Sequence, residues 1–250
     1  MSISVRDMQK LIDLCTLTLS ECDLTVNNLK TTCLRIGQRF SHTSCELFMN
    51  NCKLCWKSEM KYLGVCILSG KKFTCNLQLV RQKFYRAVSG VFGKIFCTQN
   101  PTLILSVINS FCVPILLYGL EAVHLNVSSM KSIDFMYNSV FAKVFKTSDN
   151  NTISQCQYYT RHLPISCVLD LKIMNFLSAL PLLSNSLPLI ISKLSNMCDV
   201  SDIARRYAIN SDLLMHCGKD VRKRLMWSWF EEKQATLAKI YLNKIICCID

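Results

Sequence analysis

Acidic residues are absent from the whole stretch between Met60 and Leu120. The chain as a whole has 29 Lys and Arg against 17 Asp and Glu, a net charge of +12. A segment of one sign in a basic chain favours an anionic partner, and polynucleotide is the first candidate. The charge excess alone does not separate nucleic acid from an anionic membrane surface. The basic residues of the stretch are Lys61, Lys71, Lys72, Arg81, Lys83, Arg86 and Lys94.

The N-terminal segment lacks an uninterrupted apolar run, because Arg6, Asp7 and Asp13 interrupt it. We therefore expect no signal peptide and an intracellular chain. The 16 cysteines among 250 residues are then expected to be reduced and mostly buried, where a thiol behaves as a small hydrophobic group.

A second pair of closely spaced cysteines is also missing near Cys52 and Cys55, which have the spacing of a zinc knuckle. A structural zinc ion needs four ligands, so we expect no metal site. His42 and Cys45 are the neighbouring residues that would have to complete one.

Charged residues are missing between Ile95 and Leu120 and again between Ile173 and Ser192. Each stretch approaches the roughly 20 apolar residues that a membrane span needs. Pro101 and Pro114 interrupt the first stretch and Pro181 the second. We expect buried helices and no membrane partner, and a multi-span membrane protein remains an alternative.

Residues 1–70 have the pattern of a mixed segment. Ser4 precedes an apolar repeat at helical spacing, with Asp7 in the position of a capping box, which predicts a helix ending near Cys22. The repeat consists of Met8, Leu11, Ile12, Cys15, Leu19 and Cys22. Short strands bounded by turn residues are predicted at 24–27, 32–36, 45–49, 53–56 and 61–68.

After Lys72 the pattern becomes helical throughout. The next helix has one apolar stripe, with Lys83, Arg86, Gly90 and Lys94 on its other side. The stripe consists of Leu77, Val80, Phe84, Val88, Val91 and Ile95. The sequence therefore predicts an α+β fold with segments 1–70, 71–150 and 151–250, the last two all-helical.

Three further features divide the helical part. Pro101 is predicted to start a helix that runs toward Tyr118. Ser128 or Ser129 is predicted to cap the next helix. Later helices are predicted to be interrupted at Pro164, Pro181, Pro188 and Gly218. The helix after Ser129 is predicted to face inward with Met130, Ile133, Tyr137, Phe141 and Val144.

Four segments resemble, in their order and spacing, reverse transcriptases of non-LTR (LINE-type, jockey-like) retrotransposons. They are residues 23–27 with 30–36, residues 61–65, residues 81–87 and residues 114–121. The resemblance extends from about Val5 to Lys146. It implies a partial polymerase palm, built of a helix and short antiparallel strands, followed by an all-α thumb and a helical C-terminal region.

The resemblance also implies roles for particular residues. Lys30 falls where the family has a lysine near the phosphates of the incoming nucleotide, and Tyr62, Leu63 and Gly64 fall in the primer grip. The remaining cations would contact the backbone of an RNA/DNA template–primer duplex: Lys71, Lys72, Arg81, Lys83, Arg86 and Lys94.

One departure limits what the resemblance implies. The family's catalytic centre uses three carboxylates that hold two Mg²⁺ ions, and two of them are adjacent aspartates. This chain has no Asp-Asp pair. We expect a fragment that holds a duplex, has no cofactor of its own and is inactive alone, with missing polymerase segments as possible partners.

Simpler interpretations of the same residues stay open. Lys30 is also typical of a solvated turn. Residues 62–64 are also typical of a core strand with a bulge at Gly64. The basic residues after Lys72 are also typical of a helix face in contact with water. Lys219, Arg222, Lys223 and Arg224 precede Trp227, Trp229 and Phe230, a pattern that favours an amphipathic core helix over a nucleic-acid surface. A helical interaction module without nucleic-acid binding is the remaining alternative.

Overall fold

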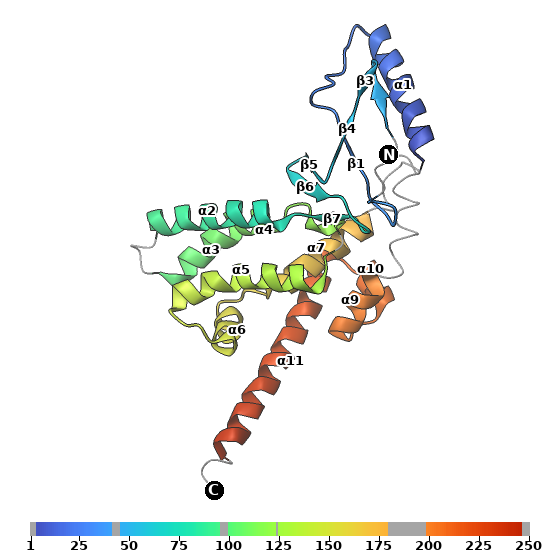
Figure 1. Ribbon diagram of the computed structural model, residues 1–250. Coiled ribbons are helices and arrows are strands. Elements are labelled where there is room, and N and C mark those ends of the chain that lie inside the picture. The colour runs from blue at the N-terminus through green and yellow to red at the C-terminus, as the bar shows by residue number, and fades with distance from the viewer. Residues whose placement is uncertain (1–3, 42–45, 96–99, 124, 180–198, 247–250) are drawn as a thin grey trace. The chain divides into compact units, whose positions relative to one another are not determined.

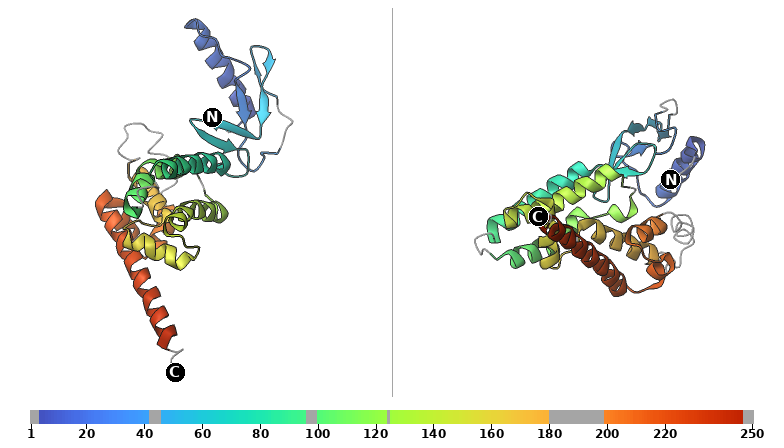
Figure 2. Two further views of the ribbon diagram at one scale, coloured as in Figure 1. Left: turned by 90° about the vertical axis from the view of Figure 1, so that its left-hand side faces the viewer. Right: turned by 90° about the horizontal axis from the view of Figure 1, so that it is seen from below.

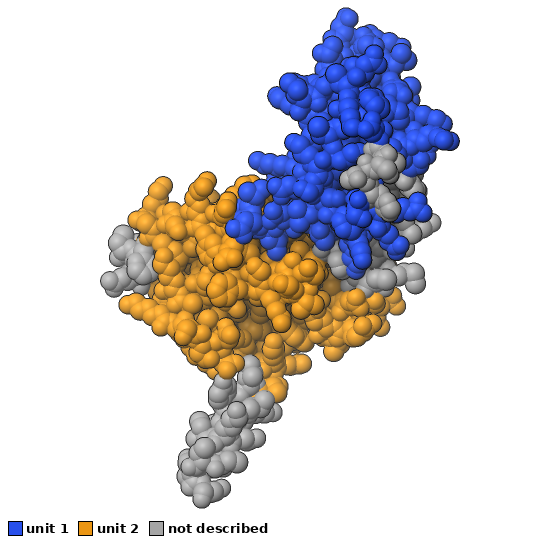
Figure 3. Space-filling model, viewed as in Figure 1, with its two compact units in different colours: residues 1–79 blue, residues 80–250 orange. Residues whose placement is uncertain are grey.

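The computed structural model describes residues 4–41, 46–95, 100–123, 125–179 and 199–246. Helices and short strands are both present (Figure 1), which confirms the α+β class. The chain forms two compact units, residues 1–79 and residues 80–250 (Figure 3).

Within its described residues, the first unit holds one helix and seven short strands. They are α1 (Val5–Glu21), β1 (Thr32–Leu34), β2 (Phe48–Met49), β3 (Cys52–Lys53), β4 (Cys55–Lys57), β5 (Glu59–Tyr62), β6 (Val65–Leu68) and β7 (Thr74–Cys75). The strand predicted at residues 24–27 was wrong, since that segment has no regular structure.

The strands form three small sheets, and one of them corrects the prediction of antiparallel strands only. β2 pairs with β3, and β5, β6 and β7 form a three-stranded sheet, all antiparallel. β1 instead pairs with β4 in parallel, with Cys33 opposite Trp56. The connection between β1 and β4 carries the β2–β3 hairpin, and a connection of this length permits a parallel crossover.

Helix α1 lies where the sequence placed it, and Met8 and Ile12 of its predicted apolar repeat are half-buried against the cluster around Leu47. Ser4 is the N-cap residue, yet its side chain makes no capping hydrogen bond. No residue of α1 is buried, and Leu11 is 42% exposed. The helix is joined to the sheet by the Gln9 amide group, which donates to the Phe48 carbonyl and accepts from the Phe48 N–H, both at 2.8 Å.

The second unit is helical throughout its described part. Its elements are α2 (Leu77–Ile95), whose first residues belong to the first unit, α3 (Pro101–Phe111), α4 (Val113–Leu116), η2 (Leu120–Ala122), α5 (Val127–Phe145), α6 (Asn150–Tyr159), α7 (Ile165–Ala179), α9 (Asp199–Tyr207), α10 (Ser211–His216) and α11 (Lys219–Ile246). Two further views show their arrangement (Figure 2).

Two helix boundaries differ from the prediction. The helix that Pro101 starts ends at Phe111, and Pro114 lies in the first turn of the separate helix α4. A proline inside a longer helix would lack the N–H for an intrahelical bond. The cap of α5 is Asn126, whose side chain accepts from the Ser129 N–H at 2.7 Å, so neither Ser128 nor Ser129 is the cap.

The inward face predicted for α5 is confirmed at three of its five positions, whereas Met130 and Val144 are half-buried. Ile133, Tyr137 and Phe141 are buried, as are two residues that the prediction omitted, Met136 and Val140. The breaks predicted at Pro164 and Gly218 precede α7 and α11 directly. Those at Pro181 and Pro188 lie outside the described residues.

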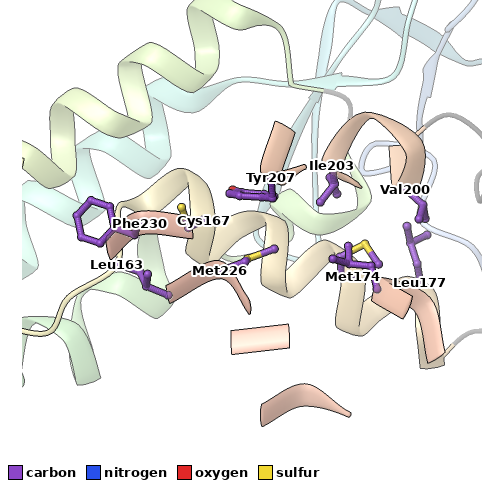
Figure 4. Packing of buried hydrophobic residues seen from close by; sticks show 10 residues of the cluster. Leu163, Cys167, Met174, Leu177, Val200, Ile203, Tyr207, Met226 and Phe230 are labelled. Carbon is purple, nitrogen blue, oxygen red and sulfur yellow. The ribbon is translucent and has the colours of Figure 1, made fainter. Parts of the chain in front are cut away.

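A hydrophobic cluster joins α7, α9, α10 and α11. Figure 4 shows its side chains converging, with Phe230 of α11 near Cys167 of α7. Trp227 and Trp229 pack against this cluster. The interpretation of the C-terminal aromatic residues as the face of a core helix is therefore confirmed.

Arg222 does not belong to the solvated basic cluster that the sequence suggested. It is 3% exposed, whereas its neighbours Lys223 and Arg224 are exposed. The sequence pattern missed this because a cation on an amphipathic helix normally lies in water.

The described thiols are less uniformly buried than expected. Cys66, Cys112 and Cys167 are buried, and burial raises the pKa of each. Cys15, Cys22, Cys52 and Cys55 are exposed instead. Within the described ranges, no helix has the length and apolar character required to cross a membrane.

Candidate nucleic-acid interface

The outer face of α2 carries three of the predicted phosphate-binding cations. Lys83, Arg86 and Lys94 are all exposed. At about 100° per residue, they fall within a sector of about 80° of the helix. At about 1.5 Å per residue, the row extends for about 16 Å along the axis.

The opposite face of α2 anchors the helix. Phe84, Val88 and Phe92 repeat every four residues and are buried. This confirms the predicted amphipathic pattern, with Phe92 added to the stripe. Because the apolar side is held in the core, the row of cations faces solvent.

No acidic partner neutralises the first two cations of the row. In the part of the chain that the structure describes, neither Lys83 nor Arg86 forms an ion pair. Gly90 lies on the same face between Arg86 and Lys94, and a Cβ built on it would meet no atom within 4 Å. A flat strip of backbone therefore lies between two cations.

Arg81 is separated from this row. By the same helical geometry it lies about 140–160° away from Lys83 and Arg86. Its guanidinium carbon is 5.8 Å from the centroid of the Tyr85 ring, within range of a cation–π contact. Arg81 is exposed, but it does not extend the face formed by Lys83, Arg86 and Lys94.

Lys143 of α5 is an exposed cation that contacts the other face of α2, opposite the row of Lys83, Arg86 and Lys94. Its ammonium nitrogen lies 4.2 Å from the centroid of the Phe92 ring of α2. Nothing in the sequence indicated this contact, because Lys143 lies far along the chain from α2 and reaches Phe92 only through the packing of α5 on α2.

Residues 62–64 form a turn, so the single strand predicted at 61–68 was wrong. Tyr62 at the end of β5 is paired with Val65 at the start of β6, which leaves Leu63 and Gly64 as a two-residue loop. Their φ angles are +45° and +87°. Positive φ at both positions is the signature of a type I′ hairpin turn. The core-strand interpretation is excluded.

The tip of this hairpin exposes an unusual pair of side chains. Tyr62 is 59% exposed and Leu63 is 73% exposed. A leucine with positive φ is an outlier, since asparagine or glycine is normally found there. Such strain costs about 1–3 kcal/mol and tends to occur at binding or catalytic sites.

Lys71 and Lys72 lie at the other end of strand β6 from this turn. Both are exposed in the connection between β6 and β7. Gly70, just before them, accepts a hydrogen bond from the Gly37 N–H at 2.8 Å. The structure therefore does not bring Lys71 and Lys72 together with the 62–64 turn.

Lys30 is exposed in a turn that Asn27 organises. The Asn27 side chain accepts from the N–H groups of Leu29 and Lys30, at 3.0 and 3.1 Å. The chain then runs through β1 to Ile36, which bridges to Gly70. At about 3.3 Å per extended residue, the chain from Lys30 to Ile36 allows a distance of at most about 20 Å from Lys30 to that bridge.

The candidate residues thus fall into separate places within their units. Lys30, the 62–64 turn, and Lys71 with Lys72 are at three positions of the first unit. Among the described residues, no group of three His, Cys, Asp or Glu side chains has the arrangement of a metal site. No protein-family model, curated protein or solved structure matches the chain.

Proposed function

We propose that this chain binds a template–primer duplex of RNA and DNA, as the palm and thumb portion of a non-LTR reverse transcriptase. The observation that carries the proposal is the exposed row of Lys83, Arg86 and Lys94 on α2, inside a stretch of sequence without acidic residues. Phosphate is the anion that cations on one face of a helix contact along a nucleic-acid duplex.

The row favours positioning over sequence recognition. Lysine and arginine on one helix face reach successive phosphates, and such contacts fix the register of a duplex without reading its bases. Gly90 supports this role because the absence of a side chain lets a phosphate backbone come close to the helix between Arg86 and Lys94.

The hairpin tip of the first unit, taken by itself, also has features that suit nucleic acid. Tyr62 presents an exposed aromatic ring, and an aromatic ring stacks on any base. Gly64 permits close approach of a sugar–phosphate backbone. These features support the role of residues 62–64 as a primer grip, a contact with the 3′ end of the primer.

Helix α1 supports a further part of the proposal, a protein partner. Its outward side exposes Leu14 by 59% and Leu17 by 60%. Neighbouring leucines on one helix face are typical of a surface that another polypeptide covers. We therefore propose that α1 packs against other polymerase segments. Without adjacent aspartates in this chain, the proposal is limited to holding a duplex.

Charge reversal on α2 tests the proposal. The double variant Lys83→Glu, Arg86→Glu should bind duplex far more weakly, and the slope of log K against log salt should become shallower by about 1.8, since each lost phosphate contact contributes about 0.9 on B-form DNA. The measurement is fluorescence anisotropy with a labelled DNA duplex at several salt concentrations. Binding of an RNA–DNA hybrid is measured at one salt concentration.

The matched control is Lys223→Glu, Arg224→Glu, which makes the same change of charge on the exposed side of α11. Its salt slope should stay near that of the wild type. An unchanged affinity and salt slope in the α2 variant would refute the proposal. Mg²⁺-dependent primer extension by the 250-residue chain would show that the chain does more than hold a duplex.

A further inference from the structure

The first unit contains a pocket that the duplex-binding proposal does not use. Its volume is about 280 Å³, slightly below the usual range of ligand sites. It lies at the carboxyl ends of the parallel strands β1 and β4, because Arg35 directly follows β1 and Ser58 directly follows β4. The lining residues are Arg35, Phe40, Ser41, Trp56, Lys57, Ser58 and Ser69.

Hydrogen bonds hold the rim of the pocket in place. The Ser69 hydroxyl donates to the Arg35 carbonyl at 2.7 Å, and the Ser69 N–H donates to the Ser58 carbonyl at 2.7 Å. The segments that follow β1, β4 and β6 are thereby joined. The pocket is built from three chain segments that are distant in sequence, so it is a feature of the fold and not of one loop.

Arg35 is the unusual residue of this pocket. Its guanidinium carbon lies 4.5 Å from the centroid of the Trp56 ring, in a cation–π contact. Its Nη2 atom is shielded from solvent and has no hydrogen-bond partner among the residues that the structure describes. A shielded charged donor without an acceptor is unfavourable, and an oxygen atom of a ligand would satisfy it.

The remaining lining defines the chemistry of that ligand. Lys57 adds a second cation, and of the described residues that line the pocket none is acidic. The hydroxyls of Ser41 and Ser58 are further donors for oxygen atoms. Phe40 and Trp56 contribute aromatic walls, which suit a planar ring. The pocket therefore combines donors for an anion with surfaces for a ring.

We propose that this pocket binds one nucleotide unit, with its phosphate toward Arg35 and its base against the aromatic walls. The volume admits a single nucleotide and not a duplex. The ligand is either a free mononucleotide or one nucleotide of a single strand, and both share the same chemistry. The site is distinct from Lys30, which precedes β1, whereas Arg35 follows it.

Binding of AMP to the full chain, measured by isothermal titration calorimetry, tests the proposal. Arg35→Gln should weaken AMP binding by about tenfold or more, as expected for loss of a charged hydrogen bond. The control Lys61→Gln removes a cation from the neighbouring strand β5 that does not line the pocket, and its affinity should equal that of the wild type.

A second measurement separates ligand binding from a structural role. Among the described residues Nη2 of Arg35 has no hydrogen-bond partner, and the guanidinium makes one cation–π contact, with Trp56. Arg35→Gln should therefore change the thermal midpoint of the free chain only slightly and abolish the rise in midpoint that AMP causes in the wild type. A fall in the midpoint of the free variant, with AMP binding retained, would assign Arg35 a structural role and overturn the proposal.

Inorganic phosphate and a single-stranded oligonucleotide complete the test. Absence of AMP binding, or equal affinity for AMP and inorganic phosphate, would also overturn the proposal, because the aromatic walls would then contribute nothing. The oligonucleotide is measured as a competitor of AMP in the Lys83→Glu, Arg86→Glu background, so that failure of the α2 face and failure of the pocket remain distinguishable. If the oligonucleotide displaces bound AMP more strongly than added AMP does, the natural ligand is a nucleotide within a single strand. If it displaces AMP more weakly, the natural ligand is a free mononucleotide.

Discussion

The guanidinium group of Arg222 donates a hydrogen bond of 2.9 Å to the side-chain oxygen of Asn175, 47 residues earlier in the chain. The same group donates to the carbonyls of Leu214 and Met215 at the end of α10, both at 2.7 Å. A positive charge at the carboxyl end of a helix is favourable, because the free carbonyls there carry partial negative charge. Arg222 thus joins α7, α10 and α11 without any carboxylate.

Replacing this guanidinium should cost much of the stability of the second unit. We expect Arg222→Met to lower the free energy of unfolding by about 3–5 kcal/mol, because the variant leaves several buried acceptors without donors. Urea unfolding followed by circular dichroism measures the loss. Arg224→Met is the control, since Arg224 is exposed two residues away, and it should change stability by about 0.5 kcal/mol or less.

The buried carboxylate of Asp170 should make stability depend on pH. Burial raises its pKa, while the hydrogen bond from Tyr207, at 2.7 Å, and the charge of Arg206 oppose the rise. A raised pKa means that the folded state holds the proton more tightly. The contribution of Asp170 to stability is therefore present below about pH 3.9 and is lost as the pH rises through its folded pKa.

Tyr207→Phe tests this dependence. Loss of the hydrogen bond should lower the free energy of unfolding near pH 7 by about 1–3 kcal/mol and move the pH window of lost stability upward. Urea unfolding at a series of pH values provides the measurement. Tyr159→Phe, at a residue 79% exposed, should follow the wild-type curve. A variant curve parallel to that of the wild type would show that Tyr207 does not set the pKa of Asp170.

The strained Leu63 should separate stability from binding. Leu63→Asn places a residue favoured in type I′ turns at this position, so the free energy of unfolding should rise by about 1 kcal/mol. Duplex binding should weaken, because the apolar tip is lost. Leu63→Ala is the matched control: it removes the same side chain and keeps the strain, so binding should weaken without a gain in stability. Unchanged binding in both variants would exclude the hairpin from the interface.

Two glycines should respond in opposite directions to the same substitution. Gly90→Ala should raise the free energy of unfolding by about 0.5–1 kcal/mol, because its surroundings are open and alanine favours a helix. Gly64→Ala should lower it by about 1–2 kcal/mol, because φ there is +87°. Thermal or urea unfolding gives both values. A loss of stability in Gly90→Ala would mean that this face of α2 is not open.

Local patterns predicted the helices well and the strand pairing poorly. The repeat from Leu77 to Ile95 predicted both the extent of α2 and the exposure of Lys83, Arg86 and Lys94, because an amphipathic helix records its environment every three to four residues. The parallel pairing of Thr32 with Cys55 has no such record, since a strand of three residues carries too little periodicity to indicate its partner.

The amino-acid sequence by itself determined the charge of this protein, its α+β character and the cationic face of α2. These properties depend on composition and on contacts within one element. Tertiary structure alone decided that Arg222 is buried, that Leu63 is the strained tip of a hairpin, and that Arg35, Trp56 and Ser69 form one pocket. Each of these results depends on residues far apart in the chain, which only the packing of the folded molecule brings together.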